Sequence, residues 1–310
     1  MKLSNSVAKT LNVDTAPDGA LKRAAKRIKR KPDLAPSDDV RAALRQLVGR
    51  HKALNKISVA NSNAACDKHL KNGEVAKCRL ADIERDEVRE LAKVMSKHAS
   101  ALETEMLRQL RKIPIYQTLL KNVYGLGPVA CAYLVAFVDI RKCEKPDQLI
   151  RYCGFACGKD GKSERLGSAE SKDGSHFNLD LKIKIVTAML SMWKTCFARP
   201  DGESTQVKTT KYMTIWTDYK HRAEHSGELA ARGKGFVHDK GRRKATDVLL
   251  EDIYVVWRTL EGLPVWPDWY AAKRGYKHGG EKINVDKDGP QTLTIEEALE
   301  LVGDVGSRPC

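Results

Sequence analysis

The chain has 310 residues, of which 42% are hydrophobic, so it can bury one large core or two smaller ones. Its 55 Lys and Arg residues outnumber 40 Asp and Glu, and the net charge of +15 predicts a polyanionic partner, nucleic acid foremost. No apolar run reaches the roughly 18 residues of a membrane span, and the N-terminus lacks the apolar stretch of a signal peptide. We therefore expect an intracellular protein that acts away from membranes. A basic protein without a polyanionic partner is the alternative.

The eight cysteines are expected to be reduced thiols, because intracellular compartments disfavour disulfides. Two spacings could belong to a metal site, Cys153-x3-Cys157 and Cys66-x2-His69, but neither has a second pair at zinc-finger spacing. The sequence therefore identifies no metal ligands and no cofactor, and small buried thiols are expected instead.

Residues 1–37 are predicted to form a basic flexible arm, with seven Lys and Arg residues between positions 22 and 31. Such an arm would hold phosphates without reading the base sequence, although a solvated tail has the same composition.

Residues 38–114 predict a coiled-coil helical hairpin. A first helix over 38–72 ends at Asn72-Gly73, and a second runs from about residue 80 to 113, before Pro114. Steps of 3 and 4 residues, typical of a coiled-coil seam, connect apolar positions of the second helix. The members of this predicted seam are Val88, Leu91, Met95, His98 and Leu102. The pattern predicts an antiparallel hairpin or a stalk that pairs protomers, with His98 as a polar residue that sets the register.

Residues 115–272 are predicted to form a compact helical DNA-binding domain. It begins with VYGLGPVACAYLVAFVDIRKCEKPDQLIRYCGF over 123–155, where Gly125-Leu126-Gly127 predicts a tight turn and Pro128 fits the first turn of a helix. A second short helix begins at Pro146. This is the pattern of a helix-hairpin-helix element, whose glycine turn and helix amides can approach a phosphate. A corner of the core without a ligand is the alternative.

Three further helices follow a Gly-, Ser- and Lys-rich loop over 156–178. The first, over 179–197, has a predicted apolar face of Ile183, Val186, Leu190 and Trp193. The second covers 209–225. The third, after Gly233, has a basic front and an apolar rear, and Gly262 and Pro264 end it. Residues 273–310 form a polar tail, with one short helix from residue 295 that begins with a capping box, Thr294 to Glu297.

Four stretches in this order resemble the bridge-RNA-guided, serine-type transposases of insertion sequences. They are LVGRHKALNKISVANSNAACDKHL (47–70), the glycine-turn stretch (123–155), DGKSERLGSAESKDGSHFNLDLK (160–182) and GFVHDKGRRKATDVLLEDIYVVWRTLEGLP (235–264). The resemblance covers roughly residues 40–270. It implies a coiled coil and a C-terminal helical domain with a catalytic serine, after an N-terminal ribonuclease-H-like domain with an Asp-Glu-Asp-Asp set. Residues 1–37 are too few to hold that acidic domain, so the resemblance is to the other two parts only.

The resemblance implies that a serine attacks a DNA phosphate. Ser163 is the nearest positional counterpart of that serine, and Ser168 and Ser171 are its rivals. The expected DNA contacts are Gly125, Gly127, Lys159, Lys162, Arg165, Lys172, Lys182, His238, Arg242, Arg243 and Lys244. A divalent metal would act only through the missing acidic domain. A guide RNA and a homo-oligomer paired through the coiled coil are the other implied partners.

These patterns together predict a mainly α, DNA-binding protein of transposase or recombinase type from a mobile element. It would act in DNA transposition or be a remnant of such an enzyme. The rival prediction, a non-catalytic nucleic-acid-binding architectural protein, uses the same helices and the same basic surface without chemistry.

Overall fold

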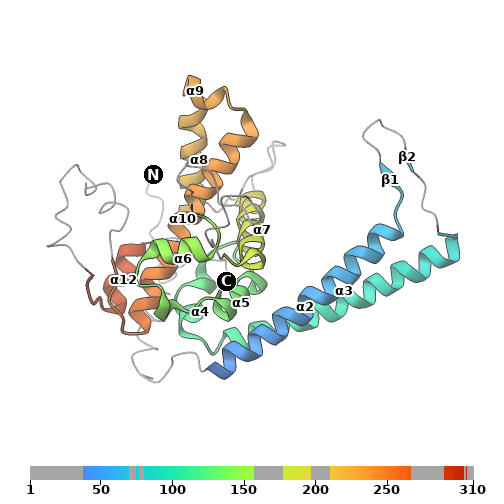
Figure 1. Ribbon diagram of the computed structural model, residues 1–310, viewed down its shortest axis with the longest axis horizontal. Coiled ribbons are helices and arrows are strands. Elements are labelled where there is room, and N and C mark those ends of the chain that lie inside the picture. Colours follow the sequence, from blue (N-terminus) through green and yellow to red (C-terminus); the bar gives the residue numbers. More distant parts are fainter. Residues whose placement is uncertain are drawn as a thin grey trace, which may run out of the picture.

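The computed structural model describes residues 38–69, 75–76, 80–156, 177–196, 210–266, 290–303 and 305 (Figure 1). Over these residues the chain is mainly helical, which confirms the predicted fold class. No helix in this part of the chain is long and apolar enough to cross a membrane. The basic arm, the loop over 157–176 and most of the polar tail lie outside the described residues. So do Ser163, Ser168, Ser171, Lys159, Lys162, Arg165 and Lys172.

Two long helices, α2 (Asp38–Ala64) and α3 (Asp82–Leu110), pack side by side and project from the rest of the molecule (Figure 1). Bonds between them show that they run antiparallel: Ser58 Oγ donates to the Ala92 carbonyl at 3.0 Å, and His51 Nε2 lies 2.9 Å from Glu103 Oε1. The first helix ends at residue 64 and not at 72. The chain there enters a two-residue antiparallel ladder, β1 (Lys68–His69) with β2 (Val75–Ala76).

The contact line between α2 and α3 differs from the predicted seam. The buried residues of α3 are Ala92, Ala99, Met106 and Leu110. Leu91 is 45% exposed and His98 is exposed, so His98 does not set the register against α2. Two neighbouring stripes of α3 have the 3-and-4 spacing, and the stripe with small alanines turns inward because it lets the two backbones approach closely. The coiled-coil character of this hairpin and its pairing of protomers stay predictions.

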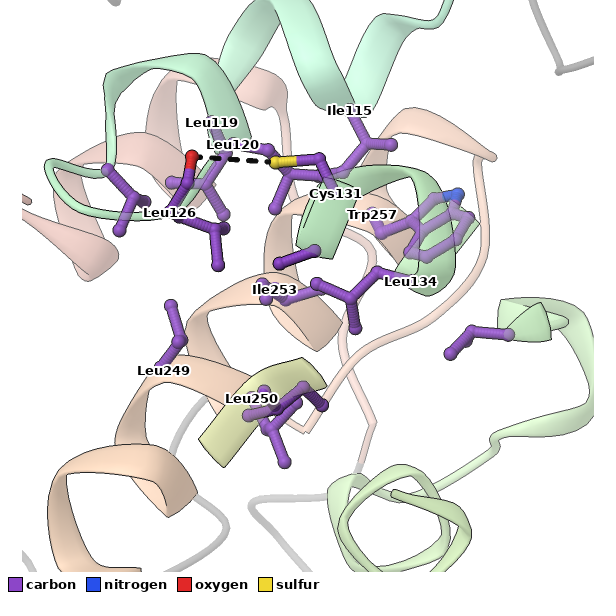
Figure 2. Packing of buried hydrophobic residues seen from close by; sticks show 14 of the residues in the cluster. Ile115, Leu119, Leu120, Leu126, Cys131, Leu134, Leu249, Leu250, Ile253 and Trp257 are labelled. Atoms are coloured by element: carbon purple, nitrogen blue, oxygen red, sulfur yellow. Dashed lines mark hydrogen bonds between the residues drawn. The ribbon is translucent and has the colours of Figure 1, made fainter. Parts of the chain in front are cut away.

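The rest of the described chain forms a helical body at the base of the hairpin (Figure 1). Its elements are α4 (Pro114–Thr118), η2 (Leu120–Asn122), α5 (Pro128–Phe137), η3 (Ile140–Lys142), α6 (Pro146–Tyr152), α7 (Leu179–Cys196), α8 (Lys211–Glu224), α9 (Gly227–Ala230), α10 (Lys234–Leu260) and α12 (Ile295–Val302). Pro114, Pro128 and Pro146 each stand in the first turn of a helix, where a missing N–H costs no hydrogen bond. Helix α10 provides the largest share of the core, and Leu249, Ile253 and other residues of it face α4 and α5 (Figure 2).

The buried face of α7 matches the predicted one only in part. Leu181, Ile185, Met189 and Met192 are buried. Three predicted residues, Val186, Leu190 and Trp193, are half-buried against the core, whereas Ile183 is 49% exposed. Helix α7 is apolar on most of its circumference, so apolar spacing alone does not select the side that packs on α5.

Helix α12 begins with the predicted capping box. Thr294 Oγ1 accepts from the Glu297 amide at 3.2 Å, and Glu297 Oε2 accepts from the Thr294 amide at 2.7 Å. The helix packs on α10, and Lys211 Nζ of α8 donates both to its Val302 carbonyl and to Asp252 of α10. This part of the predicted polar tail is thus attached to the body.

Candidate nucleic-acid interface

The two glycines of the turn before α5 have different surroundings. Gly125 has a φ of +86°, and a Cβ at this position would lie 2.8 Å from Met192 Cβ of α7. Gly127 precedes α5 with a φ of −72°, and a Cβ there would meet nothing within 4 Å. The side of Gly125 that lacks a side chain therefore faces α7, and Gly127 is the position with open space. Their contacts with DNA stay predictions.

Three side chains fix the end of α5. Arg45 Nε donates to the Ala136 carbonyl at 2.8 Å, Tyr152 OH to the Phe137 carbonyl at 3.0 Å, and Arg41 Nη2 to the Val138 carbonyl at 2.7 Å. Carbonyls at a helix C-terminus lack helical partners and carry partial negative charge, so cationic donors stabilise them. The two arginines thus join the hairpin to the body. A sequence pattern does not reveal this role.

The residues on both sides of the segment 157–176 lie close together. The Asn178 amide donates to the Tyr152 carbonyl at 3.0 Å, which joins the start of α7 to the end of α6. Arg243 Nη2 of α10 donates to the Phe155 carbonyl at 2.9 Å, and Lys182 Nζ lies 4.6 Å from the centre of the Phe177 ring. Two predicted DNA contacts, Lys182 and Arg243, are therefore brought together where this segment begins and ends.

The predicted basic triplet of α10 separates into different environments. Arg243 bonds the backbone, as described. Arg242 Nη2 donates to Asp239 Oδ1 at 3.1 Å, and its side chain is only 14% exposed. Lys244 is exposed. Arg242 and Arg243 thus both have contacts within the protein.

His238 lies in an aromatic cluster formed by α7, α8 and α10. Its ring centre is 4.9 Å from that of Trp193 and 4.8 Å from that of Trp216, and Lys220 Nζ lies 4.7 Å from the Trp193 ring centre. Burial and the nearby Lys220 lower the pKa of His238, which favours its neutral form. A Cβ at Gly241 would lie 2.5 Å from Trp216, so this glycine permits the close packing of α8 on α10. The predicted role of His238 as a DNA contact is untested, and packing accounts for its position.

Helices α8 and α9 and the first half of α10 form a projection that we call the finger, residues 211–244 (Figure 1). Its Asp and Glu residues are Asp218, Glu224, Glu228 and Asp239. Its Lys and Arg residues are Lys211, Lys220, Arg222, Arg232, Lys234, Lys240, Arg242, Arg243 and Lys244. Arg222 and Lys234 are exposed, and Lys220 and Lys240 are half-buried. Single-residue reasoning missed these four, whereas the charge excess over the two helices would have found them.

Two buried cysteines of the body, Cys143 and Cys153, are not activated as nucleophiles. Burial raises the pKa of Cys143 to about 11 and raises that of Cys153 still further. Both are therefore thiols at neutral pH, and thiols are poor nucleophiles and poor metal ligands. Within the described ranges, no group of three or more His, Cys, Asp or Glu side chains could hold a metal ion.

Comparisons of the chain with protein-family models, with curated proteins and with solved structures gave no match.

Proposed function

We propose that the chain binds DNA through the finger and the adjoining glycine turn, as a transposase-like or recombinase-like protein of a mobile element. The observation that supports this most directly is the excess of nine Lys and Arg over four Asp and Glu in the finger. Cations on a projecting element can follow the phosphates of a duplex, and the release of counterions then drives binding.

The packing of the finger supports the proposal because it holds these cations in place. Trp193, Trp216 and His238 connect three helices with ring centres less than 5 Å apart. On another side of α10, the Arg232 guanidinium and Lys240 Nζ lie 5.2 Å and 5.7 Å from the centre of the Phe236 ring. A rigid basic surface loses less conformational entropy when it binds a polyanion than flexible lysines do.

The proposed chemistry is attack by a serine of the segment 157–176. The Ser163 Oγ would lose its proton and form a bond to a DNA phosphorus while the bond to the leaving sugar oxygen breaks. That oxygen would take up a proton and leave as a hydroxyl, and a phosphodiester would then join the protein to the DNA. Such a step needs cationic stabilisation of the phosphate, and Lys182 lies near the point where the segment ends.

The proposed DNA binding is tested by removing cations from the finger. We expect the variant Lys220→Gln/Arg222→Gln/Lys234→Gln to bind duplex DNA more weakly, with a slope of log Kd against log salt smaller by about three, one for each phosphate contact. Fluorescence anisotropy over a salt series measures both quantities. The control variant Lys56→Gln/Lys93→Gln/Lys97→Gln removes the same charge from exposed positions of the hairpin. Equal losses in both variants, or a flat salt slope for the natural chain, contradict the proposed interface.

The proposed serine chemistry is tested by looking for a covalent protein–DNA adduct. Purified protein is incubated with end-containing DNA and a divalent metal, and covalent complexes are separated on a denaturing gel. Loss of an adduct in Ser163→Ala, but not in Ser168→Ala or Ser171→Ala, supports the proposed nucleophile. Tight DNA binding with no adduct in any form of the chain supports the architectural protein instead.

A further inference from the structure

An apolar stripe with incomplete burial runs along one side of the hairpin. We call it the outer stripe: Leu54 and Ile57 of α2, with Leu91, Val94, Met95 and Leu102 of α3. Ile57, Leu91 and Val94 are each 45% exposed, and the other three are half-buried. Several large apolar side chains that gather on one exposed face are typical of an interaction surface.

Helix geometry places these residues on one side. Leu91 precedes the inward-facing Ala92 by one residue, and Ile57 in the same way precedes Ser58, whose hydroxyl bonds α3. In two antiparallel helices, the same rotation away from the contact line leads to the same side of the pair. The opposite flank, one residue after each inward position, contains Lys52, Lys56, Lys93 and Ser100, with two apolar residues, Val59 and Leu107, of which Leu107 packs against the core. The two sides of the hairpin therefore differ in polarity.

We infer that the outer stripe binds a second copy of this chain, with α3 of the two protomers packed antiparallel about a two-fold axis. On α3 the stripe continues the 3-and-4 spacing of a coiled-coil seam through the exposed His98. A two-fold contact is self-complementary, so one stripe provides both halves of the interface. This inference goes beyond DNA binding and does not depend on it.

Charges beside the outer stripe favour a second copy of the chain as its partner and an antiparallel arrangement of the two α3 helices. Glu87 and Arg108 lie three heptads apart on the same flank, one beyond each end of the stripe, and both are exposed. Antiparallel pairing that places Met95 opposite His98 of the second copy brings Glu87 of each protomer beside Arg108 of the other. Parallel pairing in register would not join them, because it places Glu87 level with Glu87 and Arg108 level with Arg108 of the second copy. Arg108 is 64% exposed and bonds Glu105 of its own helix at 2.7 Å, and a guanidinium has further N–H donors for a second carboxylate.

The test measures the mass of the full chain by sedimentation at several micromolar concentrations, in salt high enough to prevent nucleic-acid binding. We expect a dimer for the natural chain. Leu91→Glu/Val94→Glu should weaken dimerisation at least about 100-fold, because two carboxylates would have to be buried. The control Lys93→Gln/Ser100→Glu lowers the net charge by the same two units on the opposite flank and should stay dimeric. Circular dichroism confirms that both variants keep their helices.

Charge exchange tests the direction of the pairing. Glu87→Arg and Arg108→Glu should each weaken the dimer, and the double variant should restore it, because each contact then joins opposite charges again. A natural chain that is monomeric throughout, or a dimer that survives Leu91→Glu/Val94→Glu, overturns the inference. A chain that dimerises only after removal of residues 1–37 also overturns it, because the basic arm would then be the occupant of the stripe.

Discussion

The hairpin and the body bury their side chains in different ways. In the body, α10 contacts several other helices, and almost every residue from 249 to 259 is buried. In the hairpin, α3 has one neighbour along most of its length and buries only Ala92, Ala99, Met106 and Leu110. Large apolar residues that the body would enclose stay half-exposed on α3. The comparison indicates that the body completes its own core, whereas the hairpin has apolar surface left for a partner.

Basic residues also have two kinds of environment. Arg41 of α2 and Arg243 and Arg258 of α10 donate to backbone carbonyls that lie 88 or more residues away in the sequence. Arg222 and Lys234 of the finger lie on its surface. The role of an arginine is therefore set by the carbonyls around it, and the density of basic residues in the sequence does not distinguish a structural arginine from one that binds DNA.

Replacing the most buried of these arginines should have the largest effect. Arg258 is 4% exposed, and it donates to the carbonyls of Ile140, Cys143 and Pro264 at 3.2, 2.7 and 2.7 Å. Arg258→Met leaves these carbonyls without that donor, and we expect it to lower the free energy of unfolding by roughly 4 kcal/mol. Urea unfolding measures this loss.

The neighbouring Arg141 provides the control for that experiment. Its side chain is 50% exposed and it lies next to one of the carbonyls that Arg258 binds. We expect Arg141→Met to leave the unfolding midpoint nearly unchanged. If the two variants lose equal stability, the buried donor has no special role and the contrast between the two kinds of arginine is wrong.

Substitution of Gly125 in the glycine turn should cause the next largest loss of stability. Gly125→Ala forces a side chain into a left-handed backbone conformation and against the Met192 backbone, whose Cα would lie 2.9 Å from the new Cβ. We expect a loss of about 3 kcal/mol, because strain and a steric clash both contribute. Gly127→Ala adds a methyl group in open space at a φ of −72° and should cost less than about 1 kcal/mol.

DNA affinity separates the two explanations for this turn. If Gly125 serves packing alone, the fraction of Gly125→Ala that remains folded binds DNA like the natural chain. A loss of affinity in Gly127→Ala without loss of stability would favour a backbone contact with phosphate at that position.

The sequence predicts the helices better than it predicts which sides they bury. Prolines in the first turns and the capping box of α12 act through adjacent residues, so local patterns identify them. On α3 and α7 two neighbouring stripes are both apolar, and the choice between them depends on contacts with α2 and α5. Local spacing contains no information on such distant partners. The predicted face of α7 is therefore only half-buried against the core, and the predicted seam of α3 lies beside the contact line with α2.

The sequence also predicts only the local part of the candidate interface, because contacts between distant residues form only in the folded chain. The overall charge and the run Arg242-Arg243-Lys244 indicate that α10 is basic, and the DNA contacts of this run stay predictions. The carbonyl of Phe155 and the ring of Trp216 come close to α10 only in the folded chain. Arg222 and Lys234, two exposed cations of the finger, lie on separate helices, so no single motif contains them.

Substitution in the contact line between α2 and α3 should have a moderate effect on the free energy of unfolding. Ala99 is buried between α2 and α3, whereas His98 is exposed beside it. Ala99→Leu should overfill the contact and cost about 2 kcal/mol, and His98→Leu should leave the stability of a single chain nearly unchanged. Both variants are measured by urea unfolding in the Leu91→Glu/Val94→Glu background, so that association does not contribute. The reverse order would mean that the predicted seam, and not the alanine stripe, contacts α2.

The smallest expected effect on stability comes from His238 in the aromatic cluster of the finger, and it is a change in how Tm depends on pH. Burial and the nearby Lys220 and Arg242 lower the pKa of His238 below its usual 6.5, while Asp239 partly opposes them. Below pH 6.5 the unfolded chain therefore binds a proton at this histidine more readily than the folded chain does. The contribution of neutral His238 is complete above that pH and is lost as the pH falls through its folded pKa.

His238→Phe should abolish this loss, so that the difference in Tm between pH 8 and pH 5 is smaller for the variant than for the natural chain. His225→Phe, which changes a histidine at the exposed end of α8, serves as the control for the other histidines. An unchanged difference in His238→Phe would mean that folding leaves the pKa of His238 at its usual value, so that the packing of the cluster does not oppose protonation of the ring.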